Sequence, residues 1–275
     1  MEDVTDEGDE PSYLLHDLVD VCPDPPESRS VCDTCRRPST VCWCPYLPVK
    51  PLAVSTTICI LQHPYEESRR LKTAPMLYHG LQPGKCHIFK GKHFQPDSIP
   101  KLQEMMSDPH TLLLFPGETA EDIKKVATEG IGSETEASSP VAYNVILLDG
   151  TWLQAKALFH QNKFLHKLRR AEIRARQPSQ YVIRTQPTNG SLSTLETAAI
   201  AISVLESKPD IVEVLVRPLK ALCNFQMQFG AVIHHSKEYL IENGLYTKAL
   251  PKSKRRRQNI LRIVHDCTRK ANDCS

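Results

Sequence analysis

The run LLDGTW places a carboxylate, a glycine, a hydroxyl and an indole in a row where an apolar segment meets a helical pattern. Asp149 follows the apolar run 144–148, so we expect it at the carboxyl end of a buried strand, where ligands bind in open α/β sheets. A carboxylate there could accept a proton from a substrate. Alternatively, Asp149 only caps the next helix, although Thr151 and Gln154 fit a capping box that could leave Asp149 free.

Four closely spaced cysteines have the pattern of a metal site. Two residues separate Cys32 from Cys35, and one separates Cys42 from Cys44. Such turns can present four thiolates tetrahedrally to zinc, whose coordination would fold a segment too small to fold alone. The alternative is disulfides or unrelated buried thiols, which the acidic, signal-free start of the sequence disfavours. We expect free thiols at the scattered cysteines, which are Cys22, Cys59, Cys86, Cys223, Cys267 and Cys274.

Other chemistry-bearing residues are expected at the same sheet edge. Ser193 and Glu196 match a second capping box, and the unpaired amides of such a helix start favour a carboxylate or phosphate. The box also fits an ordinary helix start. The loop FPGE, 115–118, follows another expected strand. A further cluster after a strand contains His63, Glu66, Arg69 and Arg70, whose plain interpretation is a structural histidine with solvated surface charges.

The elements that must position these residues alternate along the chain. Short apolar runs predict buried strands at 56–62, 85–90, 111–115, 144–148 and 180–184. Helical patterns occupy 99–108, 120–128, 151–168, 193–207 and 212–229, and a Gly/Ser/acidic loop is expected at 129–140. This alternation predicts an α/β domain with a mainly parallel sheet.

Composition limits the function. The chain has 275 residues and a formal net charge of +2, which suits one substantial domain with small additions. We expect a disordered acidic and Pro-rich tail at 1–28, a zinc-binding module at 29–50, a catalytic domain at 51–248 and a basic tail at 249–275. No apolar run is long enough to span a membrane. A GxxxxGK[ST] loop and a strand-linked GxGxxG are both absent, which disfavours ordinary nucleotide hydrolases and Rossmann dehydrogenases.

The ordered motifs CDTCRRPSTVCWC, LQHPYEESRRLKTAPML, FPGE, LLDGTWLQAKAL and RTQPTNGSLSTLETAA closely resemble the DTW-domain family of tRNA-uridine aminocarboxypropyltransferases, over about residues 30–235. The resemblance implies a SPOUT-like α/β fold whose C-terminal part can be threaded into a trefoil knot. It also implies transfer of a 3-amino-3-carboxypropyl group from S-adenosylmethionine to N3 of a uridine in the tRNA D-loop, with release of methylthioadenosine.

The family's motifs imply roles for particular residues. Its D-x-T-W motif falls on Asp149, Thr151 and Trp152 as the catalytic set, with Asp149 as the expected base and Trp152 either stacking on a nucleobase or lying in the core. The expected cofactor-binding residues are Phe115, Pro116, Gly117, Glu118, Leu192, Ser193, Thr194 and Glu196. The expected structural zinc ligands are Cys32, Cys35, Cys42 and Cys44.

Basic segments are expected to bind tRNA. The RNA-binding residues predicted from the stretch after Asp149 and from the H-P-x-E cluster are His63, Arg69, Lys163, Lys167, Arg169 and Arg170. For the helical ones the alternative is an ordinary solvated face. The run KSKRRR, 252–257, could contact RNA or act as a nuclear localisation signal, so we expect a location in both cytoplasm and nucleus. Two other functions stay open, a SPOUT-type RNA methyltransferase and a non-enzymatic zinc-containing RNA-binding protein.

Overall fold

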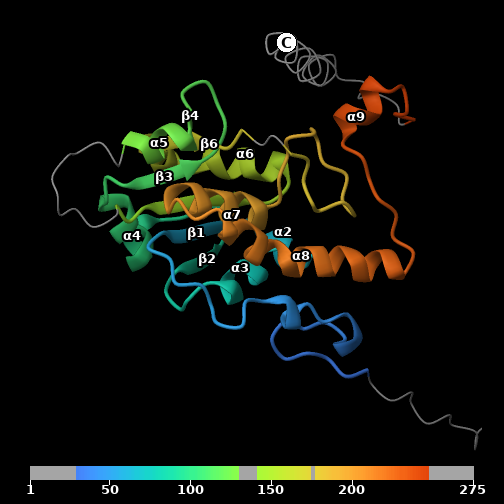
Figure 1. The fold of residues 1–275 in the computed structure, drawn as a ribbon. Coiled ribbons are helices and arrows are strands. Elements are labelled where there is room, and N and C mark those ends of the chain that lie inside the picture. Colours follow the sequence, from blue (N-terminus) through green and yellow to red (C-terminus); the bar gives the residue numbers. More distant parts are fainter. Residues whose placement is uncertain (1–28, 130–140, 175–176, 248–275) are drawn as a thin grey trace, which may run out of the picture.

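The computed structural model describes residues 29–129, 141–174 and 177–247 (Figure 1). The tail expected at 1–28, the basic tail at 249–275 and nearly all of the expected acidic loop lie outside these ranges. Among the described residues, no helix is long and apolar enough to cross a membrane.

One sheet organises the described part of the chain. Its strands all run parallel, in the order β2-β1-β5-β3-β6-β4 (Figure 1). They are β1 (Thr57–Gln62), β2 (Cys86–Lys90), β3 (Thr111–Leu114), β4 (Glu121–Asp122), β5 (Asn144–Asp149) and β6 (Arg169–Glu172). The α/β class with a parallel sheet is confirmed, as are the strands predicted at 56–62, 85–90, 111–115 and 144–148. The central strands are almost continuously apolar because helices cover both faces.

The prediction of a strand at 180–184 is wrong. This apolar run is irregular, and Tyr181 is buried in the core while Val182 and Ile183 pack against it. A strand that the sequence did not predict, β6, is formed by the charged segment RRAE. Only Ala171 of this strand is buried, because β6 lies near the edge of the sheet, where the two-residue β4 is its outer neighbour.

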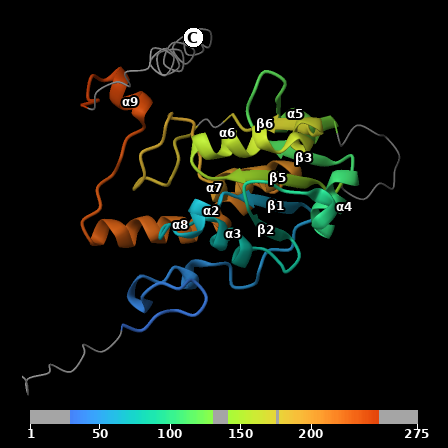
Figure 2. The same cartoon turned by 180° about the vertical axis from the view of Figure 1, so that it is seen from behind.

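Helices cover the sheet in two layers, as Figures 1 and 2 show from opposite sides. One layer consists of α3 (Ala74–Gly80), α5 (Ile123–Glu129), α7 (Thr194–Leu205) and α8 (Asp210–Gln228), and it shares a core with Ile58 and Ile60 of β1. The other layer is formed by α4 (Pro100–Ser107) and α6 (Trp152–Gln161), which pack against Cys59 and Leu61. Alternate residues of one strand therefore face the two layers.

Helix α6 ends earlier than its sequence pattern predicts. The expected helix at 151–168 stops at Gln161 and continues as the 3-10 turn η4 (Lys163–Lys167). The buried Asn162 explains the break, since its Nδ2 donates to the carbonyls of Leu158 and Lys92 and its Oδ1 accepts from the amide of Phe94. The side chain thereby terminates α6 and attaches it to the loop after β2.

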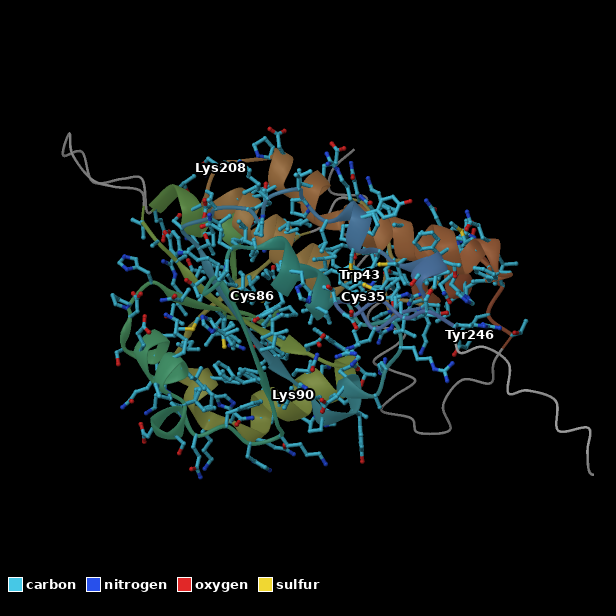
Figure 3. The ribbon with its side chains drawn as sticks, turned by 90° about the horizontal axis from the view of Figure 1, so that it is seen from below. Cys35, Trp43, Cys86, Lys90, Lys208 and Tyr246 are labelled. Carbon is cyan, nitrogen blue, oxygen red and sulfur yellow. The ribbon has the colours of Figure 1, made fainter. Side chains whose placement is uncertain are left out.

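The cysteine-bearing segment is joined to the sheet domain through its own core residue. It contains η1 (Ser39–Val41) and η2 (Cys44–Tyr46), and Trp43 between them is only 3% exposed. Figure 3, a view from below, labels Trp43 and Cys35, and Cys35 packs against the apolar cluster that contains Trp43. Trp43 belongs to the same apolar cluster as α3, α7 and α8. The predicted division at residue 50 therefore crosses a shared core.

The remaining helices are short or peripheral. The turn η3 (Pro96–Ser98) precedes α4, and α2 (Pro64–Glu67) follows β1 directly. Helix α9 (Lys237–Glu242) lies beside the loop before α7, where the amide of Lys237 donates to the carbonyl of Gln186 and Glu238 Oε2 accepts from the amide of Asn189. Helix α9 therefore supports the loop that leads into α7.

Candidate functional site

Asp149 is the last residue of β5, and two distant segments hold its carboxylate. Its Oδ2 accepts a 2.8 Å hydrogen bond from Nε2 of Gln62, and its Oδ1 accepts a 2.6 Å bond from Oγ1 of Thr194. Gln62 is its register partner at the end of β1, and Thr194 is the first residue of α7. Asp149 is only 8% exposed. Parallel strands thus bring a buried, doubly bonded carboxylate to the carboxyl edge of the sheet.

Asp149 does not cap the helix that follows it. Thr151 is the N-cap of α6, with Oγ1 accepting from the amide of Gln154 and the Gln154 side chain accepting from the amide of Thr151. Gly150 is needed for this turn, because a Cβ there would lie 2.9 Å from Cβ of Gln154. The capping alternative for Asp149 is therefore wrong, and Thr151 acts in the turn that presents Trp152.

The start of α7 is attached to the preceding loop through Glu196. Ser193 caps the helix with the predicted capping box. The Glu196 carboxylate, 4% exposed, accepts bonds from the amide and hydroxyl of Ser193, from the Ser179 hydroxyl and from the Gln180 amide. These four donors occupy it, so Glu196 holds the loop in place, and its predicted contact with a cofactor stays a prediction. Thr194 and Leu192 flank the cap and are partly exposed.

The segment after β1 places a second buried carboxylate, that of Glu66, near Asp149. His63 caps α2, with Nδ1 accepting from the amide of Tyr65, and its own amide donates to the Asp149 carbonyl. Burial, aided by the charge of Lys92, lowers the pKa of His63. Burial also raises the pKa of Glu66, and repulsion from Asp149 adds to the rise.

Arg69 is the partner of Glu66. Its Nε lies 3.0 Å from Glu66 Oε1 as an ion pair, yet no donor among the described residues is aligned for a directed hydrogen bond to that buried oxygen. Arg69 lowers the pKa of Glu66 and so opposes the effect of burial. Two of the residues predicted to bind RNA, His63 and Arg69, thus have structural partners here, and their RNA contacts stay predictions.

The FPGE loop contributes one buried ring and an exposed turn. Phe115 is 7% exposed and stacks on Trp152, with ring centroids 5.8 Å apart. Trp152 itself is 47% exposed, so it lies at the surface beside the site rather than in the core. Pro116, Gly117 and Glu118 are exposed. Among the described residues no hydrogen bond or ion pair joins Glu118 to Asp149, and the cofactor role of this loop stays a prediction.

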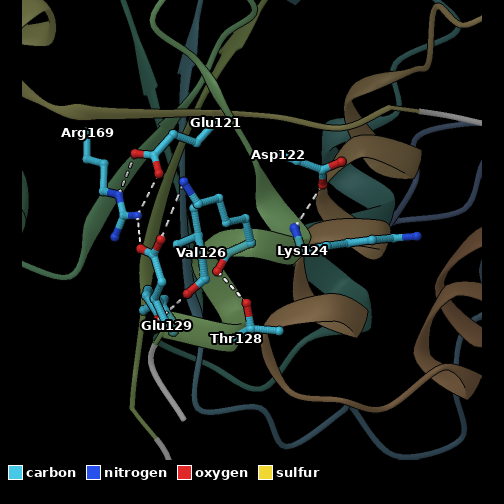
Figure 4. A network of polar contacts seen from close by, with 9 residues as sticks. Glu121, Asp122, Lys124, Val126, Thr128, Glu129 and Arg169 are labelled. Atoms are coloured by element: carbon cyan, nitrogen blue, oxygen red, sulfur yellow. Dashed lines mark hydrogen bonds and ion pairs between the residues drawn. The ribbon is translucent and has the colours of Figure 1, made fainter. Parts of the chain in front are cut away.

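The predicted RNA-binding residues after α6 differ in their surroundings. Lys163 and Lys167 are exposed. Arg169 is paired with Glu121, through bonds of 2.9 Å from Nε and Nη2, and with Glu129, and Figure 4 shows the guanidinium facing both carboxylates. These bonds raise the pKa of Arg169. Arg169 therefore already pairs with two carboxylates of the chain itself, and an RNA phosphate would have to compete with them.

Arg170, the next residue of the same strand, faces helix α6. Its guanidinium bonds to the Thr119 hydroxyl and lies 5.5 Å from the ring centroid of Phe159. A Cβ at Gly117 would approach Nη1 of Arg170 to 3.0 Å. Arg170 thus packs along the FPGE loop. In this position its charge can support the loop, and it can also contact RNA.

The four predicted metal ligands come together. Cys32, Cys35, Cys42 and Cys44 have sulfur atoms that all lie within 4.8 Å of one another. The Sγ atoms of Cys32 and Cys44 are 3.8 Å apart, and those of Cys35 and Cys42 are 3.6 Å apart. Four sulfurs at a zinc–sulfur distance of about 2.3 Å form a tetrahedron with edges of roughly 3.8 Å. The set therefore fits zinc and is far too wide for disulfides, whose sulfurs lie about 2.05 Å apart.

A cavity of about 300 Å³ lies behind the cap of α7. Leu192 and Glu196 line it together with Gln180 from the preceding loop, and apolar residues of α7 and α8 such as Ile200 and Val216 form its interior. Asp149 is not part of its lining. The cap of α7 therefore separates the carboxylate at the sheet edge from a partly apolar hollow.

The motif order predicts a carboxylate at the sheet edge with a four-cysteine cluster upstream. The structure has this arrangement, because Asp149 lies between β1, β5 and the capped start of α7. The model of the DTW domain matches residues 29–227, and the chain therefore belongs to the DTW-domain family. No solved structure matches the chain significantly.

Curated relatives cover most of the chain. The tRNA-uridine aminocarboxypropyltransferase 2 of Drosophila melanogaster is 48% identical over 237 residues, which are 86% of this chain and 90% of the fly protein. The protein of the same name from Mus musculus is 46% identical over 231 residues, 84% of this chain and 74% of its own. The tRNA-uridine aminocarboxypropyltransferase A of Arabidopsis thaliana is 27% identical over 220 residues, 73% of this chain and 82% of its own.

Sequence reasoning missed several residues around Asp149. Gln62 holds the carboxylate, and its only signal was a polar residue ending an otherwise apolar strand. Tyr65 and Lys92 lie beside His63, and Lys156 lies over Trp152. The contacts of Gln62 and Lys92 join segments that are distant in the chain, and no local pattern indicates them.

Proposed function

We propose that this protein transfers the 3-amino-3-carboxypropyl group of S-adenosylmethionine to N3 of a uridine in the tRNA D-loop. The observation that carries the proposal is the Asp149 carboxylate, buried at the carboxyl edge of the sheet and held by Gln62 and Thr194 instead of by its own helix. The printed names of relatives up to 48% identical support the same reaction.

S-adenosylmethionine, when bound, supplies a sulfonium that makes its aminocarboxypropyl carbon open to attack, and methylthioadenosine is the leaving group. The chain's own task is positioning and proton transfer. Asp149 accepts the N3 proton of uridine while the bond from N3 to carbon forms and the carbon–sulfur bond breaks. Each of its oxygens takes one bond from the chain and keeps a second lone pair for the substrate.

Helix α7 offers donors to the acidic end of the cofactor. Its capping box satisfies the amides of Ser193 and Glu196. The first-turn amide of Thr194, a partly exposed residue, is then a donor that the helix start presents to an anion. We assign to it the α-carboxylate of S-adenosylmethionine, and the cavity lined by Leu192 can take an apolar part of the same molecule.

We further propose that zinc occupies the Cys32, Cys35, Cys42 and Cys44 cluster and acts structurally. All four positions are cysteines, which matches closed structural sites and leaves no open position for a substrate. The cluster packs beside the shared core through Cys35 and Cys44. Zinc would therefore hold the upstream segment, with Trp43, against the domain.

A SPOUT-like fold with a knotted C-terminal part is the finer fold proposal. Its support is the all-parallel sheet and the irregular segment 177–193 before α7, which contacts the segment after β1. There the Tyr181 hydroxyl donates to the carbonyl of Leu71, 2.7 Å away. Location in cytoplasm and nucleus also stays a proposal, based on the run KSKRRR, which lies outside the described residues.

The decisive experiment combines the purified full-length chain, S-adenosylmethionine and an unmodified tRNA transcript. Mass spectrometry of the digested nucleosides should show an aminocarboxypropyl adduct on uridine, with an equal amount of methylthioadenosine. A methyl adduct with no methylthioadenosine would support the methyltransferase alternative. Binding of tRNA with no adduct of either kind would support the non-enzymatic alternative.

Asp149→Asn tests the assigned base within that assay. The amide keeps the shape but cannot accept the proton, so the transfer rate should fall by about 100-fold or more. Asp97→Asn, at an exposed carboxylate in η3, is the matched control and should keep the wild-type rate. A full rate in Asp149→Asn would instead favour Glu66, the neighbouring carboxylate with a raised pKa, as the acceptor.

A further inference from the structure

Two exposed aromatic rings flank the buried carboxylate. Tyr65 is 64% exposed and Trp152 is 47% exposed. Gln62 and Asp149 are register partners at the ends of β1 and β5, and each ring lies three residues beyond its strand end. Neighbouring parallel strands end about 5 Å apart. The two rings therefore belong to the two turns that leave the same point of the sheet edge.

Each ring is supported on one side. Trp152 stacks on the buried Phe115 at an interplanar angle of 27°. Tyr65 contacts the ring of the buried His63, with centroids 5.2 Å apart. The rings are thus held in place by interior residues while much of their surface stays in solvent, where a ligand can reach it.

Each ring also carries an ammonium group. Lys92 Nζ lies 5.5 Å from the ring centroid of Tyr65, and Lys156 Nζ lies 5.5 Å from that of Trp152. Lys92 comes from the loop after β2, whereas Lys156 lies one turn further along α6 from Trp152. The same combination of a ring and a cation therefore occurs on both sides of Asp149.

We infer that Tyr65 with Lys92, and Trp152 with Lys156, form a stacking surface for unpaired RNA nucleotides next to the target uridine. This inference rests on the proposed function. A nucleobase stacked on an exposed ring replaces a weaker ammonium contact, and the flexible lysine then reaches the phosphate of the same nucleotide. A base within a duplex has no free face, so the surface selects unpaired nucleotides.

A protein partner fits this surface less well. Lysine is depleted from protein–protein interfaces, where a buried ammonium loses hydration. Here a lysine accompanies each ring. Aromatic rings paired with cations are instead the components of single-strand nucleic-acid sites.

The test measures binding of an unmodified tRNA transcript and of a fully paired RNA duplex by the full chain. Tyr65→Ala should weaken tRNA binding by between about five- and about 100-fold and leave duplex binding unchanged. Tyr65→Phe keeps the ring and should recover most of that loss. Tyr78→Ala is the control, because Tyr78 is a 52% exposed ring in α3, away from the carboxyl ends of the strands.

The lysines are tested through salt dependence. Lys92→Met should reduce the slope of log affinity against log salt for tRNA by about one, as expected for one lost phosphate contact. Trp152→Phe is the second ring variant, because it keeps a ring against Phe115 and should weaken binding less than Trp152→Ala.

Several results would overturn the inference. Wild-type tRNA affinity in Tyr65→Ala, an equal loss in Tyr65→Phe, or an equal loss for the duplex would each show that the ring is not a stacking surface. If the wild-type chain transfers the aminocarboxypropyl group and Tyr65→Ala still binds normally, only the inference fails. If the wild-type chain transfers nothing, the proposed function fails, while the binding arms still decide the inference.

Discussion

Thr194→Val offers the sharpest test of how Asp149 is oriented. The substitution preserves the size and branching of the side chain and removes only the hydroxyl that donates to Asp149 Oδ1 at 2.6 Å. Gln62 is then the remaining side-chain donor to the carboxylate among the described residues. The acid keeps its charge and its burial but loses one of the two bonds that define its direction.

The size of the effect follows from the type of bond. A hydrogen bond to a charged group contributes about 1.5–3 kcal/mol. If that bond holds the carboxylate in its reactive orientation, its loss lowers kcat/KM by between about tenfold and about 150-fold. The KM for tRNA should change little, because Asp149 is only 8% exposed and valine keeps the shape of the Thr194 side chain.

Steady-state transfer kinetics with a tRNA transcript measure this change, and thermal unfolding shows whether the fold is intact. Thr197→Val makes the same substitution three residues further along α7, at a hydroxyl that does not bond to Asp149, and should keep the wild-type rate. In an Asp149→Asn background, Thr194→Val should have almost no further effect, because the two residues act as a unit. A wild-type rate in Thr194→Val, or equal losses in both threonine variants, would refute the reasoning.

Four further predictions concern metal, protons, RNA and an ion pair. Cys32→Ser should abolish bound zinc, measured by elemental analysis, and lower Tm by at least about 5 °C, whereas Ser30→Ala in the same segment should change neither. Because burial and Lys92 lower the pKa of His63, the unfolded chain binds more protons, so thermal stability should fall as pH drops from about 6.5; His63→Asn keeps a capping acceptor and should flatten this slope. Reversing the charge of the exposed Lys163 and Lys167 should reduce the salt slope of tRNA binding by about two or more. Arg169→Ala should instead lower thermal stability, since it leaves Glu121 and Glu129 without their shared cation.

The sequence was informative wherever a feature is local. The capping boxes at Thr151 and Ser193 depend on residues three positions apart, and both were predicted correctly. The cysteine cluster is almost as local, because short turns bring its sulfurs together. Buried central strands such as β1 and β5 have apolar residues on both faces, and this makes them recognisable.

Features that depend on tertiary contacts were not predictable in the same way. Strand β6 has the composition of a surface helix, and it is a strand because its neighbours β3 and β4 pair with it. Helix α6 ends where Asn162 bonds to a loop far away in the chain. Arg169 reads as a phosphate contact until the fold places Glu121 and Glu129 next to it.

The position of the Asp149 carboxylate depends on segments that are distant in the sequence, and this explains why the motifs must occur together. Thr194 can reach Asp149 only if α7 starts where it does, and Glu196 determines that start by binding the loop at Ser179 and Gln180. That loop in turn is attached through Tyr181 to the segment after β1, whose first residues bond to Asp149 from the other side. A change in any one of these attachments therefore alters the direction of the same carboxylate. The L-S-T-x-E motif at 192–196 and the H-P-x-E motif at 63–66 are accordingly as important to the proposed proton transfer as the residues of the D-x-T-W motif.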